Sequence, residues 1–201
     1  DEAAPATETP PAAAMLDAAI AGDHRTAEEK ARDAWRHPKE TLAFFGVEPD
    51  MTVVEIWPGG GWYTKILAPY LASGGGVYIA AQRDPASSPR AAEAVQKFKD
   101  AYADTALYGD IRVSVLGDGA EVAPAGTADV VLTFRNVHNW MSAGEAEANF
   151  AAFYRALKPG GVLGVVEHRA MKEAGDDVSS GYVKGSTVKA LAEGAGFVFV
   201  E

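Results

Sequence analysis

A glycine-rich loop with an acid in front of it is the stretch of this sequence best suited to hold a ligand. Residues 53–63 read VVEIWPGGGWY, so Glu55 shortly precedes three consecutive glycines, Gly59, Gly60 and Gly61. Glycines let a backbone approach a ligand closely. Glu55 would repel the pyrophosphate of a dinucleotide, whereas it would attract a ligand that carries an ammonium or sulfonium group. The loop therefore predicts a cofactor with an aminoacyl end rather than NAD.

A second group of polar side chains follows the apolar run ADVVLTF (128–134). Arg135, Asn136 and His138 come directly after this run, and Trp140 is two residues further on. An imidazole titrates near neutral pH, so His138 is the predicted general base, and Asn136 is predicted to orient the substrate beside it. We assign Arg135 to the cofactor, and Trp140 to the substrate or a sulfonium. The alternative is that His138 caps the following helix and Trp140 belongs to the core.

The sequence Glu167-His168-Arg169 ends another predicted strand with three polar residues. We predict that His168 and Arg169 contact the substrate. His138, Glu167 and His168 could together bind a metal ion, since histidine and carboxylate sets are common ligands of zinc and related metals. Histidines on neighbouring strands more often form hydrogen bonds, and we therefore predict no metal site.

Apolar strands that alternate with helices are expected to position these groups. Strands are predicted at 51–57, 76–82, 111–116, 128–134, 161–168 and 196–201, and helices at 62–72, 89–104, 143–157 and 186–193. This order favours an α/β fold with a mostly parallel sheet that is covered by helices on both faces. Ligands in such folds bind beyond the carboxyl ends of the strands, where the strand order reverses. The polar groups above all end or follow predicted strands, so we expect them to converge on one site.

The chain is expected to form one domain with a helical segment in front of it. Residues 1–14 are rich in Ala, Pro, Thr and Glu and are predicted to be a disordered tail. Residues 15–45 carry apolar side chains at helical spacing, with interruptions near Gly22 and Pro38, and are predicted to form an N-terminal helical lid. Within this lid Arg36 and His37 are candidates for ligand contact. Residues 46–201 form the predicted α/β core.

Composition and charge argue against several functions. The chain has 18 basic and 28 acidic residues without a run of Lys and Arg, which argues against nucleic acid as a partner. It has no cysteine, so thiol nucleophiles, disulfides and thiolate metal sites are excluded. No apolar run approaches the roughly 20 residues that a membrane-spanning helix needs. A small-molecule substrate is the expected partner, and the sequence does not indicate an oligomeric state.

Four motifs of the chain resemble those of the class I S-adenosylmethionine-dependent methyltransferases. They are VVEIWPGGGW (53–62), GDGAE (117–121), ADVVLTFRNVHNW (128–140) and LKPGGVLGVVEH (157–168), and the resemblance extends over about residues 40–201. It implies a Rossmann-like fold with S-adenosylmethionine as the cofactor. The residues assigned to the cofactor are Glu55, Gly59, Gly60, Gly61 and Tyr63 at the aminoacyl end, Gln82 or Asp84 at the ribose, and Asp118 at the adenine.

The sequence departs from the family pattern at three places. Trp57 stands where the first glycine of the loop belongs, and Gln82 stands where an acid normally binds the ribose hydroxyls. A seventh strand is apparently missing, since residue 201 falls within or after the predicted sixth strand. We predict that Trp57 keeps a β-region backbone, and that its indole points away from the cofactor and packs under the N-terminal segment.

The resemblance implies methyl transfer from S-adenosylmethionine to a small molecule. The departures leave open an alternative, a catalytically inactive relative that acts as a binding or interaction module. Residues 36–71 also resemble a group of bacterial predicted methyltransferases that often carry an export signal. Together with the small residues near Asp1, this resemblance favours a periplasmic or secreted protein, with the cytoplasm as the alternative.

Overall fold

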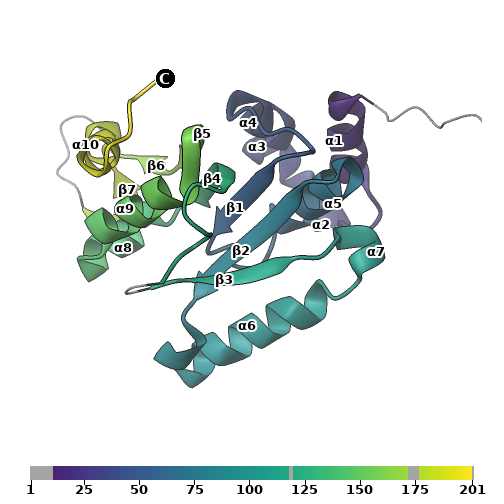
Figure 1. Ribbon diagram of the computed structural model, residues 1–201, viewed down its shortest axis with the longest axis horizontal. Helices are drawn as coiled ribbons and strands as arrows, with labels where there is room; N and C mark the ends of the chain where they lie inside the picture. The colour runs from purple at the N-terminus through teal and green to yellow at the C-terminus, as the bar shows by residue number, and fades with distance from the viewer. Residues whose placement is uncertain (1–10, 118–119, 172–176, 201) are drawn as a thin grey trace, which may run out of the picture.

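The chain folds around a five-stranded parallel sheet with helices on both faces (Figure 1). The computed structural model describes residues 11–117, 120–171 and 177–200. The strands lie in the order β3-β2-β1-β4-β5, and each neighbouring pair is parallel. Their bounds are β1 Thr52–Ile56, β2 Val77–Arg83, β3 Arg112–Leu116, β4 Ala128–Phe134 and β5 Leu157–Val166. The predicted α/β fold is thus confirmed.

Helices precede, connect and follow the strands. The N-terminal helices are α1 Ala12–Ala21, α2 Ala27–Ala31, α3 Asp33–Arg36 and α4 Pro38–Phe44. Those of the core are α5 Thr64–Gly74, α6 Pro89–Ala101, α7 Thr105–Tyr108, α8 Val137–Ala143, α9 Ala146–Ala156 and α10 Gly185–Ala195. Two 3-10 turns, Pro85–Ser87 and Val178–Ser180, and a small parallel pair, β6 His168–Arg169 and β7 Tyr182–Val183, lie in the connections. In the described ranges no helix has the length and apolar character to cross a membrane.

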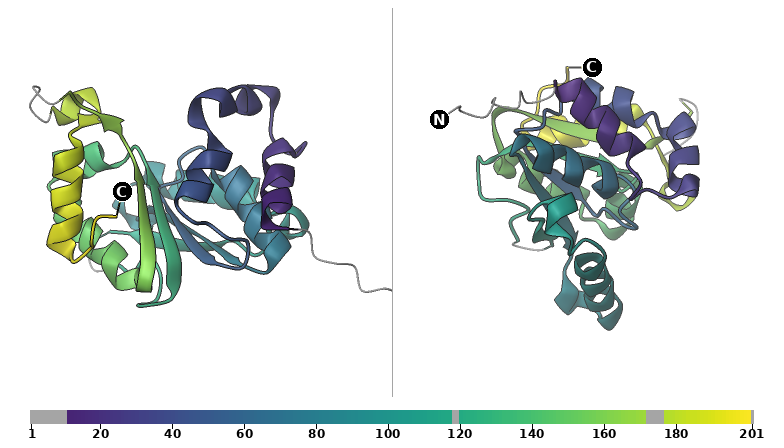
Figure 2. Two further views of the ribbon diagram at one scale, coloured as in Figure 1. Left: turned by 90° about the horizontal axis from the view of Figure 1, so that it is seen from above. Right: turned by 90° about the vertical axis from the view of Figure 1, so that its right-hand side faces the viewer.

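The two faces of the sheet carry separate apolar clusters. Figure 2 (left) shows α1 to α5 on one side of the sheet and α8 to α10 on the other. Because side chains alternate along a strand, Val53 of β1 packs in the cluster with α1 and α5, whereas Val54 and Ile56 pack in the cluster with α8 and α9. Glu55 has the same parity as Val53, so its carboxyl group lies on the side of α5.

The strand order reverses between β1 and β4. From β1 the chain runs outward to β2 and β3, and it then returns to β4 on the other side of β1. The loops that follow β1 and β4 therefore diverge at the carboxyl edge of the sheet, where α/β folds bind ligands. The side chain of Asn136 joins the two strand ends, because its Nδ2 donates a hydrogen bond of 3.0 Å to the carbonyl of Ile56.

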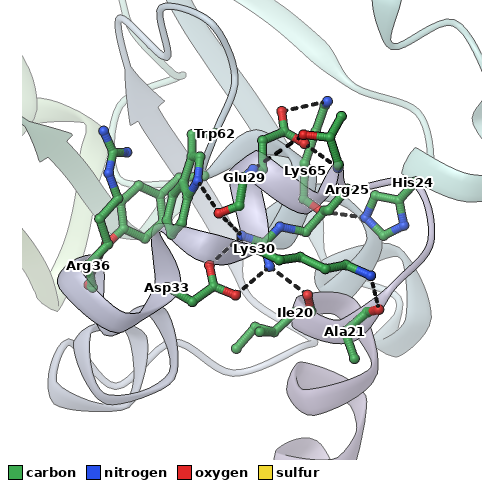
Figure 3. Close-up of polar contacts among 12 residues, drawn as sticks. Ile20, Ala21, His24, Arg25, Glu29, Lys30, Asp33, Arg36, Trp62 and Lys65 are labelled. Carbon is green, nitrogen blue, oxygen red and sulfur yellow. Dashed lines mark hydrogen bonds and ion pairs between the residues drawn. The ribbon is translucent and has the colours of Figure 1, made fainter.

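A buried arginine anchors the N-terminal helices to the core (Figure 3). The guanidinium of Arg25 donates to both carboxylate oxygens of Asp33, at 2.9 and 2.6 Å. It also lies over the ring of Trp62, whose Nε1 donates to the carbonyl of Glu29 at 3.1 Å. Lys65 of α5 in turn pairs with the Glu29 carboxylate at 2.7 Å. These contacts fix α2 and α3 beside the loop that follows β1.

The predicted sixth strand at 196–201 is wrong for its described residues. Residues 197–200 have no regular structure, and Val198 and Val200 are 85% and 87% exposed. A strand needs a neighbour to satisfy its backbone groups, and within the described chain this apolar segment pairs with none. The described residues likewise contain no seventh strand of the main sheet.

Several predicted helix boundaries also change. The helix predicted at 143–157 is two helices, because Gly144 adopts the left-handed φ of 72° and ends α8. The second of these helices ends at Ala156, and the sequence LKPGG (157–161) that follows it already belongs to β5. Helix α1 begins at Ala12, inside the predicted tail, whose residues 1–10 lie outside the described residues.

Candidate functional site

A cavity of about 610 Å³ opens at the carboxyl ends of β1 and β4. Its volume is in the range of pockets that bind small molecules. Its walls come from the N-terminal helices, from β1 with its loop, and from the segments after β4 and β5. The lining residues are Glu29, Arg32 and Arg36; Glu55, Trp57, Pro58, Gly59, Gly60, Trp62 and Tyr63; and Phe134, Arg135, Asn136, His138, His168 and Gly181.

Glu55 is the buried acid of this cavity. It is 2% exposed, and its Oε2 accepts hydrogen bonds from the hydroxyls of Tyr78 and Thr64, at 2.5 and 3.3 Å. Burial raises the pKa of Glu55 to about 7, although both hydrogen bonds and the charge of Arg36 act in the opposite direction. An ionised carboxylate in such a place attracts a cation more strongly than it would in water. This is the chemistry expected of a group that binds an ammonium.

The glycine loop is held in left-handed turns. Gly59 and Gly61 have φ values of 59° and 74°. A Cβ at Gly61 would collide with the hydroxyl group of Tyr102, so only glycine fits there. Gly59 and Gly60 lie on the cavity wall, whereas Gly61 is buried and is not a lining residue. Two of the three glycines are therefore placed for close approach to a ligand, and the third is required by packing.

Trp57 differs from the prediction in both its backbone and its side chain. Its φ of 48° lies in the left-handed region, not in the β region. This turn breaks the alternation of β1, so the indole packs on the side of α8 against Trp140, with 5.6 Å between ring centroids, and not under the N-terminal segment. The guanidinium of Arg83 lies 3.5 Å from the centroid of the Trp57 ring. The indole forms part of the cavity wall and leaves the cavity open.

The strained backbone at residue 57 leads to a test of stability. Trp57→Gly is expected to be about 1 kcal/mol more stable than Trp57→Ala, because both variants lose the contacts with Trp140 and Arg83 but only glycine adopts a φ of 48° without strain. Urea unfolding measures the difference. Gly60→Ala is the matched control without loss of stability, since Gly60 has no positive φ and open space around it. Equal stabilities of the two residue 57 variants would show that the left-handed turn is absent in solution.

The predicted ribose contacts lie at the end of β2. Gln82 is buried, and its Nε2 has no hydrogen-bond partner among the described residues, which leaves a donor for a ligand hydroxyl. The carboxylate of Asp84 accepts from the backbone N–H of Ala86 at 2.8 Å and caps the following turn. Neither residue lines the cavity; at this strand end the guanidinium of Arg83 lies over the ring of Trp57, which is a lining residue. Asp118, predicted at the adenine, lies outside the described residues.

Asn136 lines the cavity, but its amide group binds the protein. Its Nδ2 donates to the carbonyl of Ile56 and, at 3.2 Å, to the hydroxyl oxygen of Thr133. The side chain is 9% exposed. Its amide nitrogen therefore holds the ends of β1 and β4 together, which is a positioning role that the predicted contact with substrate did not include.

His138 is paired with a carboxylate behind it. Its Nδ1 lies 3.2 Å from Oε2 of Glu167, and the same oxygen accepts the backbone N–H of Val137 at 2.9 Å. Glu167 thereby fixes the orientation of the imidazole. Within the described residues Nε2 has no hydrogen-bond partner, and His138 lines the cavity. The pair has the arrangement of a general base with an orienting acid.

Trp140 is a core residue, and its predicted contact with substrate is wrong. Its side chain is 0% exposed and packs against Trp57, Phe150 and Phe153. Helix α8 begins at Val137, so Trp140 lies one turn into the helix on the same inward face. The alternative considered for this residue, a place in the core, is the correct one.

Of the three remaining predicted contacts, two line the cavity and one does not. His168 is exposed, lines the cavity and has its ring centroid 5.3 Å from that of Tyr182. Arg169 is exposed and lies outside the cavity wall. Arg135 lines the cavity with a left-handed φ of 60°. No group of three His, Asp or Glu side chains in the described part of the chain is arranged to hold a metal ion.

Tyr63 lines the cavity with its ring flat against a neighbour. It stacks on Phe134 with 3.7 Å between ring centroids, and its hydroxyl donates to the carbonyl of Arg36 at 3.4 Å. Sequence reasoning missed Phe134 and Arg32 as parts of this wall. The only sequence signals for them are the last position of a strand and the spacing of Arg32 from Arg36 by one helical turn.

Comparison with known proteins yields matches among solved structures. No family model and no curated protein matches the chain. It is similar to a SAM-dependent methyltransferase from Aquifex aeolicus, with a TM-score of 0.60 and 20% identity over 83% of this chain and 82% of that chain. It is also similar to the trans-methyltransferase CalH in complex with SAH, with a TM-score of 0.54 and 17% identity over 90% of this chain and 55% of that chain. For the [4+2]-cyclase SpnF the TM-score is 0.57 and the identity 18%, over 90% of this chain and 63% of that chain.

These similarities define the class of fold. The chain has the Rossmann-like α/β fold of S-adenosylmethionine-dependent methyltransferases, with the strand order 3-2-1-4-5. At these sequence identities the similarity concerns the fold and not the reaction. A cyclase among the similar structures illustrates the general rule that function depends on the site that a fold carries.

Proposed function

We propose that the protein binds S-adenosylmethionine and transfers its methyl group to a small molecule. The observation that carries this proposal is Glu55, a buried acid on the cavity wall just before the glycine loop. Its raised pKa and its place at the end of β1 fit a partner that brings a positive charge. The Nε2 of Gln82, which has no hydrogen-bond partner among the described residues, lies outside the cavity wall at the next strand end and would donate to a ribose hydroxyl that extends there.

Each residue of the site has a separate role in this proposal. Glu55 accepts the ammonium group, Gly59 and Gly60 give room to the aminoacyl chain, and Gln82 donates to the ribose. When bound, S-adenosylmethionine supplies an electrophilic methyl group on a sulfonium, and methyl transfer needs mainly proximity and alignment. Glu167 orients His138, and the Nε2 of His138 takes the proton that an O–H or N–H group of the acceptor loses.

The affinity for S-adenosylhomocysteine is expected to rise with pH. Because the pKa of Glu55 is about 7, the carboxyl group is about one-tenth ionised at pH 6 and about nine-tenths ionised at pH 8. Only the ionised form attracts the ammonium, so the association constant should increase about tenfold over this range. Calorimetry at several pH values measures it. A flat profile, in a protein that stays folded throughout, would contradict the assignment of Glu55.

The function is tested by methyl transfer to an extract of small molecules. S-adenosylmethionine is incubated with the protein and the extract, and S-adenosylhomocysteine is measured by mass spectrometry. We expect its formation to need both the protein and the extract, and to fall about 100-fold in His138→Gln, in which S-adenosylhomocysteine still binds normally. Failure of the folded protein to bind S-adenosylhomocysteine at millimolar concentration would refute the proposal.

A second candidate function is a binding module without methyl transfer. The observation that favours it is that the end of β2 contributes no lining residue, whereas Trp57, with Arg83 of β2 stacked on its ring, does line the cavity. If this pair excludes the adenosyl group, S-adenosylhomocysteine should bind Trp57→Gly and not the unchanged protein. Binding to both proteins with similar affinity would remove this candidate.

A further inference from the structure

Three arginines line the cavity, and in the described part of the chain none of them has a carboxylate partner. Arg32 lies between α2 and α3, Arg36 is the last residue of α3, and Arg135 comes from the loop after β4. Within residues 11–117, 120–171 and 177–200 none of them forms an ion pair. Burial and the charges of Arg32 and Arg135 lower the pKa of Arg36, although the charge of Glu55 acts in the opposite direction. Arg36 is therefore repelled by both of the other arginines. This local excess of positive charge stands within a chain of net charge -10.

The carboxylates near the cavity do not neutralise this excess. Glu29 is engaged by Lys65 at 2.7 Å and by the backbone N–H of Thr26 at 2.8 Å. Glu55 is engaged by hydroxyl groups, as described above. Glu167 accepts from Val137 and interacts with His138. Glu55 attracts Arg36 through its charge, but within the described residues no acid forms an ion pair with Arg32, Arg36 or Arg135. The three guanidinium groups therefore remain available to a ligand.

Arg25, which has a structural role, differs from these three arginines because a carboxylate neutralises its charge. Figure 3 shows Trp62 between the side chains of Arg25 and Arg36, whose guanidinium carbons lie 5.0 and 4.6 Å from the Trp62 ring. Arg25 is 3% exposed and is neutralised by Asp33, whereas Arg36 lines the cavity and has no such partner among the residues that the structure describes. Stacking on an indole holds a guanidinium in place without removing its charge. Arg36 is therefore positioned and still available to an anion.

We propose that Arg32, Arg36 and Arg135 bind the methyl acceptor, and that this acceptor is a small anion with a carboxylate or phosphate group. For Arg135 this proposal replaces the cofactor contact that was expected from the sequence. The inference rests on the proposed function. The cofactor does not account for the cluster, because its one carboxylate is outweighed by its ammonium and sulfonium groups, so that its binding adds positive charge. A planar guanidinium matches carboxylate and phosphate groups with paired hydrogen bonds. The stacked rings of Tyr63 and Phe134 provide an apolar wall for the rest of the acceptor.

The test uses acetate and inorganic phosphate as charged probes, and acetamide as the neutral probe of similar shape. Each is titrated in low-chloride buffer, with and without saturating S-adenosylhomocysteine, while the Nε–H signals of the arginines are followed by NMR. We expect saturable shifts with acetate or phosphate and affinities at least about tenfold higher than for acetamide. The stronger of the two anions identifies the acceptor group as carboxylate or phosphate.

Substitutions then assign the binding to the cluster. Arg32→Gln, Arg36→Gln and Arg135→Gln should each weaken the anion about tenfold and change the affinity for S-adenosylhomocysteine less than threefold. Arg32 and Arg135 are exposed, so their removal leaves the fold intact even if Arg36→Gln does not. Arg90→Gln, an exposed change on α6, is the matched control and should alter neither affinity.

The outcomes separate this inference from the proposed function. Equal binding of acetate, phosphate and acetamide, or anion binding that survives all three substitutions, would overturn the inference while cofactor binding stands. Substitutions that weaken S-adenosylhomocysteine as much as the anion would also overturn it, since the arginines would then hold the cofactor carboxylate. A wild-type protein that binds the anions and not S-adenosylhomocysteine would refute the proposed function, and the assignment of an acceptor would fail with it.

Discussion

Glu55→Gln is expected to weaken the binding of S-adenosylhomocysteine by about 10- to 100-fold at pH 8. A hydrogen bond to a charged group contributes about 1.5–3 kcal/mol, and about 1.4 kcal/mol corresponds to a factor of ten. Glutamine keeps the shape of the side chain and can accept from Tyr78 and Thr64, so the loss reports the missing charge. Titration calorimetry measures the affinities directly.

The stability of the same variant separates a lost charge from a damaged fold. The pKa of Glu55 is raised above its value in an unfolded chain, so ionisation of Glu55 destabilises the folded protein as pH rises from about 4.5 to about 7. Removing this acid should leave the melting temperature at pH 8 unchanged or higher. Glu147→Gln, on the exposed surface of α9, is the control that should change neither property. Unchanged affinity in Glu55→Gln would refute its contact with the ammonium.

Trp140→Ala is expected to destabilise the protein by about 3 to 5 kcal/mol, the usual range for truncating a buried aromatic residue to alanine. Trp140 is fully buried between Trp57, Phe150 and Phe153, and the neighbouring rings cannot fill the space that it leaves. For a chain of this length the melting temperature should fall by about 6 to 20 °C. Urea unfolding and a thermal melt measure the two quantities.

Trp140→Phe is the matched variant and should cost much less. The Nε1 of Trp140 is buried and has no hydrogen-bond partner in the described part of the chain, and phenylalanine removes this unsatisfied donor while it keeps an aromatic ring. The pair of variants also tests the corrected role of the residue. If Trp140 bound a substrate, Trp140→Ala would lose activity and keep its stability, and that result would contradict a place in the core.

Elements that depend on neighbouring residues in the sequence were predicted well. The runs 51–57, 76–82, 111–116 and 128–134 coincide with β1 to β4 to within a residue or two at each end. Such runs are apolar enough to be buried on both faces of a sheet, and helices between them allow parallel pairing. The segment 196–201 carries a similar pattern and forms no strand in its described residues, because pairing depends on a neighbour and not on the segment itself.

Side-chain directions at the site were predicted less well. Glu55 follows the regular alternation of β1 and lies where the pattern places it. Trp57 was expected to follow the same alternation, but a φ of 48° turns its indole to the opposite face of the sheet. No periodicity signals a left-handed residue, because its cause is the loop that the chain must form afterwards. Trp140 was predicted to contact a ligand and lies in the core for a related reason. Helix α8 begins at Val137, and this starting point sets the direction of the Trp140 side chain.

The sequence by itself determined the α/β alternation, the glycine loop and the acid in front of it, because these depend on local composition and on spacing within a few residues. Only the tertiary structure decided which charges meet. Arg32, Arg36 and Arg135 form no basic run, and about a hundred residues separate the last of them from the others. They line one cavity because the N-terminal helices and the loop after β4 lie beside the same end of β1. Charges from distant segments act together only after the chain has folded, since their interaction depends on distance in space.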